Sequence, residues 1–179
     1  LGLGSAIHEL FRQVEWADEC DPAAIVLAWE KGLGAACAPA VRRDVVNQFR
    51  AALASEPVRA ALVKPAENAE VWREKSFEVI LGNEWISGIF DRVVITRDSA
   101  GHVNHAIIQD FKSNRIHADG DIDRAVETYR PQMDAYRRVL ARIFAIPAAK
   151  IDVQLIFTGP ARIAAVHRAD ASDSASLSL

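Results

Sequence analysis

Residues 84–112 constrain the fold more than any other part of the sequence. Two apolar runs, at 85–95 and 103–111, are rich in the β-branched and aromatic residues that favour strands. Turn-forming residues at 98–101 separate the two runs. The sequence therefore predicts an antiparallel hairpin whose apolar strands have charged side chains inside them.

Those charged residues occupy positions where burial makes an unpaired charge costly. Asp91 interrupts the first strand, and Asp110 and Lys112 flank Phe111 at the end of the second. Side chains alternate along a strand, so Asp110 and Lys112 share one face and Phe111 points to the other. Two carboxylates on adjacent strands repel each other without a cation, and Mg²⁺ is a cation that prefers oxygen ligands. The pattern predicts a divalent metal site that positions a water molecule.

Each of these charges also has a purely structural interpretation. Asp91 can form an ion pair with Arg92 or with Arg97, which lie on the same strand. Asp110 can pair with Lys112 at the strand end. Both interpretations stay open at the level of the sequence.

Polar residues also interrupt two predicted helices. Tyr129, Gln132 and Tyr136 recur at i, i+3 and i+7, so they lie on one stripe of a long amphipathic helix. Such a tyrosine stripe is more typical of a core than of a site, but a buried amide needs hydrogen-bond partners. His8 lies at the margin of the first apolar helical face, where a core histidine is commoner than a ligand.

The order of the predicted elements indicates an α/β domain with a mixed sheet backed by helices. Periodicity and cap residues predict helices at 5–19, 21–30, 41–53, 55–63 and 122–146, with Ser5 and Asp21-Pro22 at two of the starts. Strands are expected at 69–81, 151–158 and 162–168 in addition to the hairpin, and an exposed loop at 114–123. Pro131 must lie near the first turn of its helix or kink it.

Composition narrows the possible functions. A chain of 179 residues fits one domain, and no apolar run approaches the roughly 20 residues that span a bilayer. Cys20 and Cys37 are too few for a disulfide framework or a four-thiolate cluster. The net charge of −3 argues against binding nucleic acid by bulk charge alone. Because the chain has no initiator methionine, we expect a piece of a longer protein.

Five short motifs occur in a distinctive order: G-x-x-x-H-E-L-F, REKSF, GIFDR, IIQDFK and Y-x-x-Q-x-x-x-Y. From about Leu3 to Thr158 the chain thereby resembles the PD-(D/E)XK nuclease domain of RecB/AddA-type (UvrD-like) helicase–nucleases. The resemblance implies a restriction-endonuclease-like core, with a mixed β-sheet flanked by helices and a helical N-terminal part. It also implies a nuclease domain at 1–168, the C-terminal part of a longer helicase–nuclease, followed by a disordered tail at 169–179.

The resemblance implies a role for each motif residue. His8, Asp91, Asp110 and the main-chain carbonyl of Phe111 would bind the metal, Lys112 would be the catalytic lysine, and Glu74 would be the acidic residue preceding them. Gln132 and Tyr136 would support the site and the DNA backbone, with Tyr129 just upstream as a DNA contact. Independently of the resemblance, the basic residue Arg115 is expected to guide the DNA strand. The core motif is Asp-Phe-Lys where Asp-Tyr-Lys is commoner. The absence of cysteines after Cys37 excludes the family's iron–sulfur cluster.

The implied function is metal-dependent hydrolysis of DNA phosphodiester bonds, exonucleolytic on single-stranded DNA, in recombinational repair or DNA end processing. One or two Mg²⁺ or Mn²⁺ ions would be needed, and a histidine ligand favours Mn²⁺ slightly. The expected partners are a helicase domain in the same polypeptide and an AddB-like subunit, in the bacterial cytoplasm at the nucleoid and without a membrane. The alternatives are a catalytically inactive module for DNA binding or partner docking, and a free-standing exonuclease.

Overall fold

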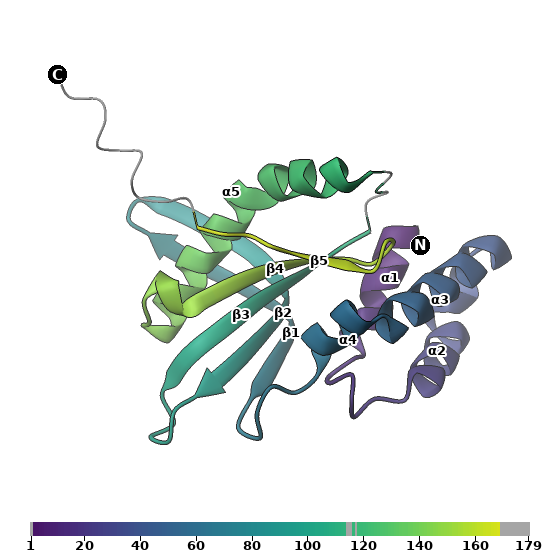
Figure 1. Ribbon diagram of the computed structural model, residues 1–179, viewed down its shortest axis with the longest axis horizontal. Coiled ribbons are helices and arrows are strands. Elements are labelled where there is room, and N and C mark those ends of the chain that lie inside the picture. Colours follow the sequence, from purple (N-terminus) through teal and green to yellow (C-terminus); the bar gives the residue numbers. More distant parts are fainter. Residues whose placement is uncertain (1, 114–115, 117, 169–179) are drawn as a thin grey trace.

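A mixed β-sheet forms the centre of the computed structural model, which describes residues 2–113, 116 and 118–168. The described residues form strands β1 (Glu70–Leu81), β2 (Glu84–Arg97), β3 (Val103–Lys112), β4 (Ile151–Phe157) and β5 (Arg162–Ala165), in that spatial order (Figure 1). Neighbours are antiparallel except β3 and β4, which run parallel. A parallel pair needs a long crossover, and the helix between these strands supplies it. The predicted α/β architecture with a mixed sheet is confirmed.

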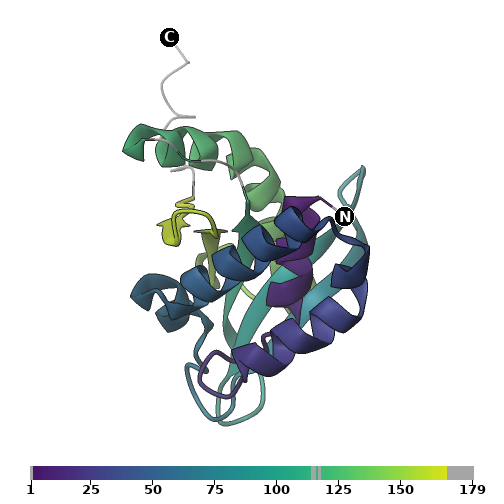
Figure 2. The same ribbon diagram turned by 90° about the vertical axis from the view of Figure 1, so that its right-hand side faces the viewer.

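Helices cover the two faces of the sheet unequally (Figures 1 and 2). One face packs against α1 (Leu3–Arg12), α2 (Pro22–Lys31), α3 (Pro39–Ala54) and α4 (Glu56–Leu62), and the 3₁₀ turn η1 (Leu33–Ala36) follows α2. The other face packs against α5 (Asp119–Phe144), which is followed by the 3₁₀ turn η2 (Ala148–Lys150). Alternation along β3 divides its side chains between the two layers: Phe111 joins the α1–α4 core and Ile108 joins the α5 core. No described helix has the length and apolarity needed to cross a membrane.

The first helix differs from its prediction at both ends. Gly2 is the N-cap and Ser5 lies inside α1, which ends at Arg12 rather than near residue 19. Val14 is buried although it is not helical, and this explains why the apolar pattern of the sequence continues past the end of α1. The carbonyls of Val14 and of the next residue accept hydrogen bonds from buried Arg92, at 2.8 and 2.6 Å. The distant Arg92 side chain therefore supplies these two carbonyls with the hydrogen bonds that a further helical turn would have supplied.

The start of α2 is confirmed as predicted. The Asp21 side chain accepts hydrogen bonds from the backbone N–H groups of Ala23 and Ala24, at 2.9 and 3.2 Å, and Pro22 occupies the first helical position. The carboxylate thus satisfies two N–H groups that a helix start leaves without partners, and proline has none to satisfy.

The long helix α5 begins at Asp119, so it includes part of the loop predicted at 114–123. Pro131 lies inside α5 rather than in its first turn, and the helix bends along its course (Figures 1 and 2). Proline cannot donate the intrahelical hydrogen bond and crowds the preceding turn, which kinks a helix. The bend lets the two halves of α5 follow the twisted sheet.

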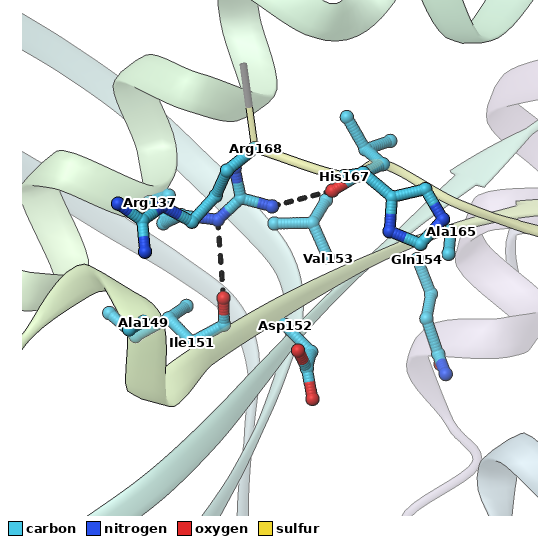
Figure 3. A pocket seen from close by; sticks show the side chains of 10 residues that line it. Arg137, Ala149, Ile151, Asp152, Val153, Gln154, Ala165, His167 and Arg168 are labelled. Carbon is cyan, nitrogen blue, oxygen red and sulfur yellow. Dashed lines mark hydrogen bonds between the residues drawn. The ribbon is translucent and has the colours of Figure 1, made fainter. Parts of the chain in front are cut away.

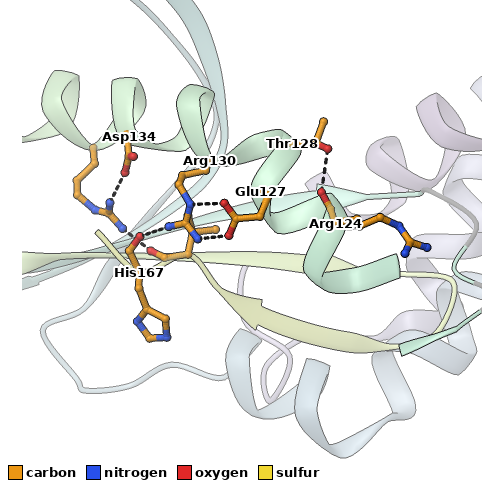
Figure 4. A network of polar contacts seen from close by, with 8 residues as sticks. Arg124, Glu127, Thr128, Arg130, Asp134 and His167 are labelled. Atoms are coloured by element: carbon orange, nitrogen blue, oxygen red, sulfur yellow. Dashed lines mark hydrogen bonds and ion pairs between the residues drawn. The ribbon is translucent and has the colours of Figure 1, made fainter. Parts of the chain in front are cut away.

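Arginines fasten α5 to the segment after β5 (Figure 4). Arg130 donates to the carbonyl of His167 at 2.5 Å and pairs with Glu127. Buried Arg137 donates to the carbonyls of Ile151 and Val166, at 3.2 and 2.6 Å. These contacts fix which face of α5 lies on the sheet.

A glycine permits close packing between β2 and α5. A Cβ atom on Gly88 would lie 2.8 Å from both the Phe77 ring and the Tyr136 hydroxyl. We expect Gly88→Ala to lower the free energy of unfolding by about 1–3 kcal/mol, as overpacked cores do. Urea unfolding measures the change. Ser87→Ala, at the exposed neighbouring position, is the matched control, and equal stability of the two variants would contradict this packing.

Candidate active site

The predicted hairpin separates at the level of its carboxylates. β2 and β3 pair up to Arg92↔Gln109, where their register ends. Beyond that point β2 stays paired with β1, and β3 stays paired with β4 as far as Lys112. Asp91 and Asp110 are the next residues on the two strands, so both lie where the strands part.

The Asp91 side chain links β2 to β3 where the backbone pairing of the two strands ends. The backbone N–H of Phe111 donates to Asp91 Oδ2 at 2.9 Å, and His8 Nδ1 lies 3.6 Å from the same oxygen. His8 is the α1 residue that the sequence places at the margin of the helix, and α1 brings it to the strand fork. The prediction that Asp91 and His8 lie in one site agrees with this geometry.

Neither arginine proposed as a structural partner pairs with Asp91. Arg92 turns to the side of α1, where it donates to Gln109 at 2.9 Å and to the loop after α1. Arg97 pairs with Glu70 at 2.7 Å. The structural interpretation of Asp91 is therefore wrong, and the basic side chain that lies beside Asp91 is His8.

Glu74 joins Asp91 and His8 from β1. One potential ligand atom from each of the three lies within 4.8 Å of the other two. In the register of the hairpin, Glu74 stands opposite Asp91, between the pairs Arg73↔Arg92 and Lys75↔Phe90. The φ of Glu74 is 50°, in the left-handed region that non-glycine residues avoid. Strain of this kind persists mainly where the surroundings impose it, often at functional sites.

The electrostatics of Asp91 are those of an uncompensated carboxylate. Burial, followed by repulsion from Asp110, raises the pKa of Asp91 to about 6, although His8 and the Phe111 N–H act in the opposite direction. The folded site therefore stabilises a proton on Asp91. A divalent cation would remove the same repulsion.

Asp110 and Lys112 form the second half of the site, on the face of β3 toward α5. Asp110 Oδ2 and Lys112 Nζ lie 2.6 Å apart, with only 7% and 13% of the side chains exposed. The ion pair that the structural interpretation predicts is present. Asp110 Oδ2 is buried and accepts no hydrogen bond from a described residue, so the close contact with the Lys112 ammonium is an ion pair.

Phe111 points away from this pair, as the alternation of β3 predicts. Its ring stacks on Phe11 of α1 at a centroid distance of 4.7 Å. The substitution of phenylalanine for the commoner tyrosine therefore changes the α1 core and not the charged face. The role of the Phe111 carbonyl as a ligand stays a prediction.

The three residues predicted to form one stripe of α5, Tyr129, Gln132 and Tyr136, lie in different surroundings. Tyr136 packs its ring edge-on against Phe77 and Phe90, at centroid distances of 5.2 and 5.3 Å. Gln132 is exposed, so the expectation of a buried amide is wrong, and it donates to the Tyr136 hydroxyl at 3.3 Å. Tyr129 lies at the site, with Lys112 Nζ 3.8 Å from its ring centroid.

The contact of Tyr129 with Lys112 indicates a role in holding the lysine. A cation–π contact of this kind contributes about 0.5–2 kcal/mol, so we expect Tyr129→Leu to lower kcat about 2- to 30-fold. Tyr129→Phe keeps the ring and should keep most of the activity. Single-turnover cleavage rates measure both, and equal loss in the two variants would assign the effect to the hydroxyl.

Two of the sequence predictions concern residues that the structure does not describe. Arg115, predicted to contact DNA, lies outside the described residues, as does the segment 169–179 predicted as a tail. A cavity of about 600 Å³ between β4 and the segment after β5, lined in part by Arg137, Asp152 and His167, contains none of the predicted site residues (Figure 3).

Arg92 has a structural role that differs from the predicted ion pair with Asp91. Its burial at 1% exposure and its contact with Trp16, 5.1 Å from the guanidinium to the ring centroid, make it an anchor for the loop after α1. The signal was present, since an arginine between apolar strand residues must find several acceptors when buried. Nothing local identified those acceptors as the carbonyls that follow α1.

Comparison with known proteins agrees with the fold. Residues 2–175 match the family model described as the PD-(D/E)XK nuclease superfamily. No curated protein matches the chain. The mixed sheet with flanking helices is consistent with the restriction-endonuclease-like fold of that superfamily. Since the match covers nearly the whole sequence, the chain belongs to the PD-(D/E)XK nuclease superfamily.

Proposed function

We propose that this protein is a Mg²⁺- or Mn²⁺-dependent deoxyribonuclease that degrades single-stranded DNA exonucleolytically, coupled to a helicase in recombinational repair or DNA end processing. The observation that carries the proposal is the meeting of His8, Glu74 and Asp91 beside the Asp110–Lys112 pair at the fork of β2 and β3. Three separate elements, α1, β1 and the β2–β3 hairpin, supply these side chains.

The residues present fit a divalent cation. His8, Glu74 and Asp91 would hold it, and the raised pKa of Asp91 is the mark of carboxylates that lack a counter-charge. Asp110 adds a further buried carboxylate next to them, which pairs with Lys112 at 2.6 Å. Carboxylates suit Mg²⁺ and Mn²⁺, and the imidazole adds a preference for Mn²⁺.

When bound, such an ion polarises a phosphoryl oxygen and lowers the pKa of a water. The chain supplies the rest of the chemistry. Lys112, fixed between Asp110 and the Tyr129 ring, presents its ammonium where it can orient the attacking water or donate to a phosphate oxygen. Its low exposure strengthens either interaction, because fewer waters compete.

The substrate and partners follow from the resemblance to RecB/AddA-type domains. The net charge of −3 fits a domain to which another domain delivers DNA, since it gives weak bulk attraction to phosphates. A helicase domain in the same polypeptide, an AddB-like subunit and a bacterial cytoplasmic, nucleoid-associated location complete the proposal.

Digestion of end-labelled single-stranded DNA with Mg²⁺ or Mn²⁺ tests the proposal. Wild type should release short products and leave circular single strands intact, whereas Asp110→Asn should be inactive. Cleavage of circles would instead indicate an endonuclease. Equal residual activity in wild type and Asp110→Asn would refute the site, and binding without any turnover would favour the inactive module.

A further inference from the structure

The hairpin of β1 and β2 has one covered face and one open face. Phe77 and Phe90 point to α5 and are buried. The opposite face, here called the hairpin face, consists of three cross-strand pairs that are all exposed: Ser76↔Ile89, Glu78↔Ser87 and Ile80↔Trp85. Within the part of the chain that the structure describes, no helix covers it.

Large apolar side chains are concentrated on this face. Trp85 is 71% exposed, its partner Ile80 is 68% exposed and Ile89 is 50% exposed. Single exposed apolar residues are ordinary, but a contiguous group marks a binding surface. Trp85 and Ile80 are cross-strand partners and form such a group, and Ile89 lies on the same face beyond the pair Glu78↔Ser87.

The hairpin face is continuous with the candidate active site. Ile89 precedes Asp91 by two positions on β2, so the two side chains point to the same side of the strand. Trp85 lies farther along, about 20 Å from Asp91 at about 3.3 Å per residue. A ligand that lies along the hairpin face therefore leads to His8, Glu74 and Asp91.

We propose that the hairpin face binds the bases of single-stranded DNA that enters the candidate active site, and this rests on the function proposed above. A shallow hollow of about 510 Å³ lies between Trp85 and the site, lined in part by Ser76, Glu78, Ser87 and Ile89. The indole and the isoleucines offer surfaces for stacking unpaired bases, which is how single strands bind without a fixed sequence.

Glu78, the acidic residue in the hollow, determines whether the bases or the phosphate backbone of the DNA faces the hairpin. A carboxylate at Glu78 repels phosphates but accepts hydrogen bonds from base amino groups, such as N4 of cytosine. The bases therefore face the hairpin, and the backbone is free to reach the metal-binding residues. In a duplex the bases are stacked and paired, so the same surface favours single strands.

The test measures binding of a labelled oligo-dC to the 179-residue chain in EDTA by fluorescence anisotropy. Trp85→Ala should weaken binding about 5- to 100-fold, the equivalent of one lost base stack. Trp85→Phe should keep most of the affinity. The control is Leu27→Ala, another exposed apolar residue but on α2, and it should bind as wild type does.

Hydrolysis of bis(p-nitrophenyl) phosphate with Mn²⁺ separates this proposal from the nuclease function. This diester is too small to span from the site to Trp85, so Trp85→Ala should hydrolyse it at the wild-type rate. If wild type fails to hydrolyse any substrate, the nuclease function is refuted while the anisotropy data still decide the role of the hairpin face. If Trp85→Ala binds oligo-dC with wild-type affinity, the proposal is overturned. The hairpin face would then be a contact surface for another protein.

Discussion

Lys112→Gln lowers kcat for hydrolysis of single-stranded DNA by about 10²- to 10⁴-fold, the loss expected when one transition-state proton donor or acceptor is removed. Lys112 Nζ lies 2.6 Å from Asp110 Oδ2 and 3.8 Å from the centroid of Tyr129, so its position is fixed before substrate binds. Glutamine keeps much of the length and the hydrogen-bonding capacity while it removes the charge. The loss should therefore appear in kcat under single-turnover conditions.

Two measurements distinguish this loss of chemistry from a loss of structure. Removing one partner of a buried ion pair costs about 3–5 kcal/mol, so unfolding curves establish that Lys112→Gln is folded at the assay temperature. Mn²⁺ binding by calorimetry should remain, because His8, Glu74 and Asp91 are unchanged. Lys75→Ala, an exposed lysine on β1, is the control and should retain wild-type kcat.

Lys112→Arg then separates two roles of the ammonium. Arginine keeps the positive charge but cannot give up its proton. Recovery of activity within about tenfold would indicate that charge on the phosphate is what matters, whereas no recovery would indicate proton transfer to or from the water. Activity of Lys112→Gln equal to that of wild type would remove Lys112 from the reaction altogether.

Local patterns predicted the elements that depend on neighbouring residues. The 84–112 hairpin was predictable because strand composition and turn residues both lie within it, and its ladder is antiparallel as expected. The Asp21-Pro22 start of α2 is likewise a local cap. The alternation that puts Asp110 and Lys112 on one face needs only the period of a strand.

Long-range contacts determined what the sequence left open. The end of α1 depends on Arg92, which is distant in the chain but donates to the carbonyls of Val14 and Glu15. The fork between β2 and β3 depends on β4 and β1 each retaining one strand. The left-handed φ of Glu74 places a carboxylate in the site against its backbone preference, and no propensity encodes that.

Asp91→Asn makes the metal-free protein more stable at pH 7, by up to about 3 kcal/mol, because about two units of pKa shift correspond to that free energy. Burial and repulsion from Asp110 raise the folded-state pKa of Asp91 to about 6, from an ordinary value of 3.8. Asparagine carries no charge, yet its amide oxygen still accepts from the Phe111 N–H. The substitution therefore removes the cost and keeps the hydrogen bond.

The size of this effect changes with pH in a defined way. Well below pH 3.8 the carboxyl group is protonated in both the folded and the unfolded state, so wild type and Asp91→Asn should be equally stable. Between pH 4 and about 6 the folded wild type holds a proton that the unfolded chain has released, so its stability falls as pH rises. The difference between the two proteins should grow through this window and stay constant above it.

Urea unfolding in EDTA at several pH values measures the difference, and Mn²⁺ reverses it. Wild type gains stability when an ion binds the native state, whereas Asp91→Asn has lost a ligand and gains less. Asp110→Asn is the companion variant, because removing the repulsion lowers the pKa of Asp91 and narrows the pH window. A difference between wild type and Asp91→Asn that does not change from pH 4 to 7 would show that Asp91 is already compensated by its protein neighbours, and the argument for a cation between these strands would lose its electrostatic basis.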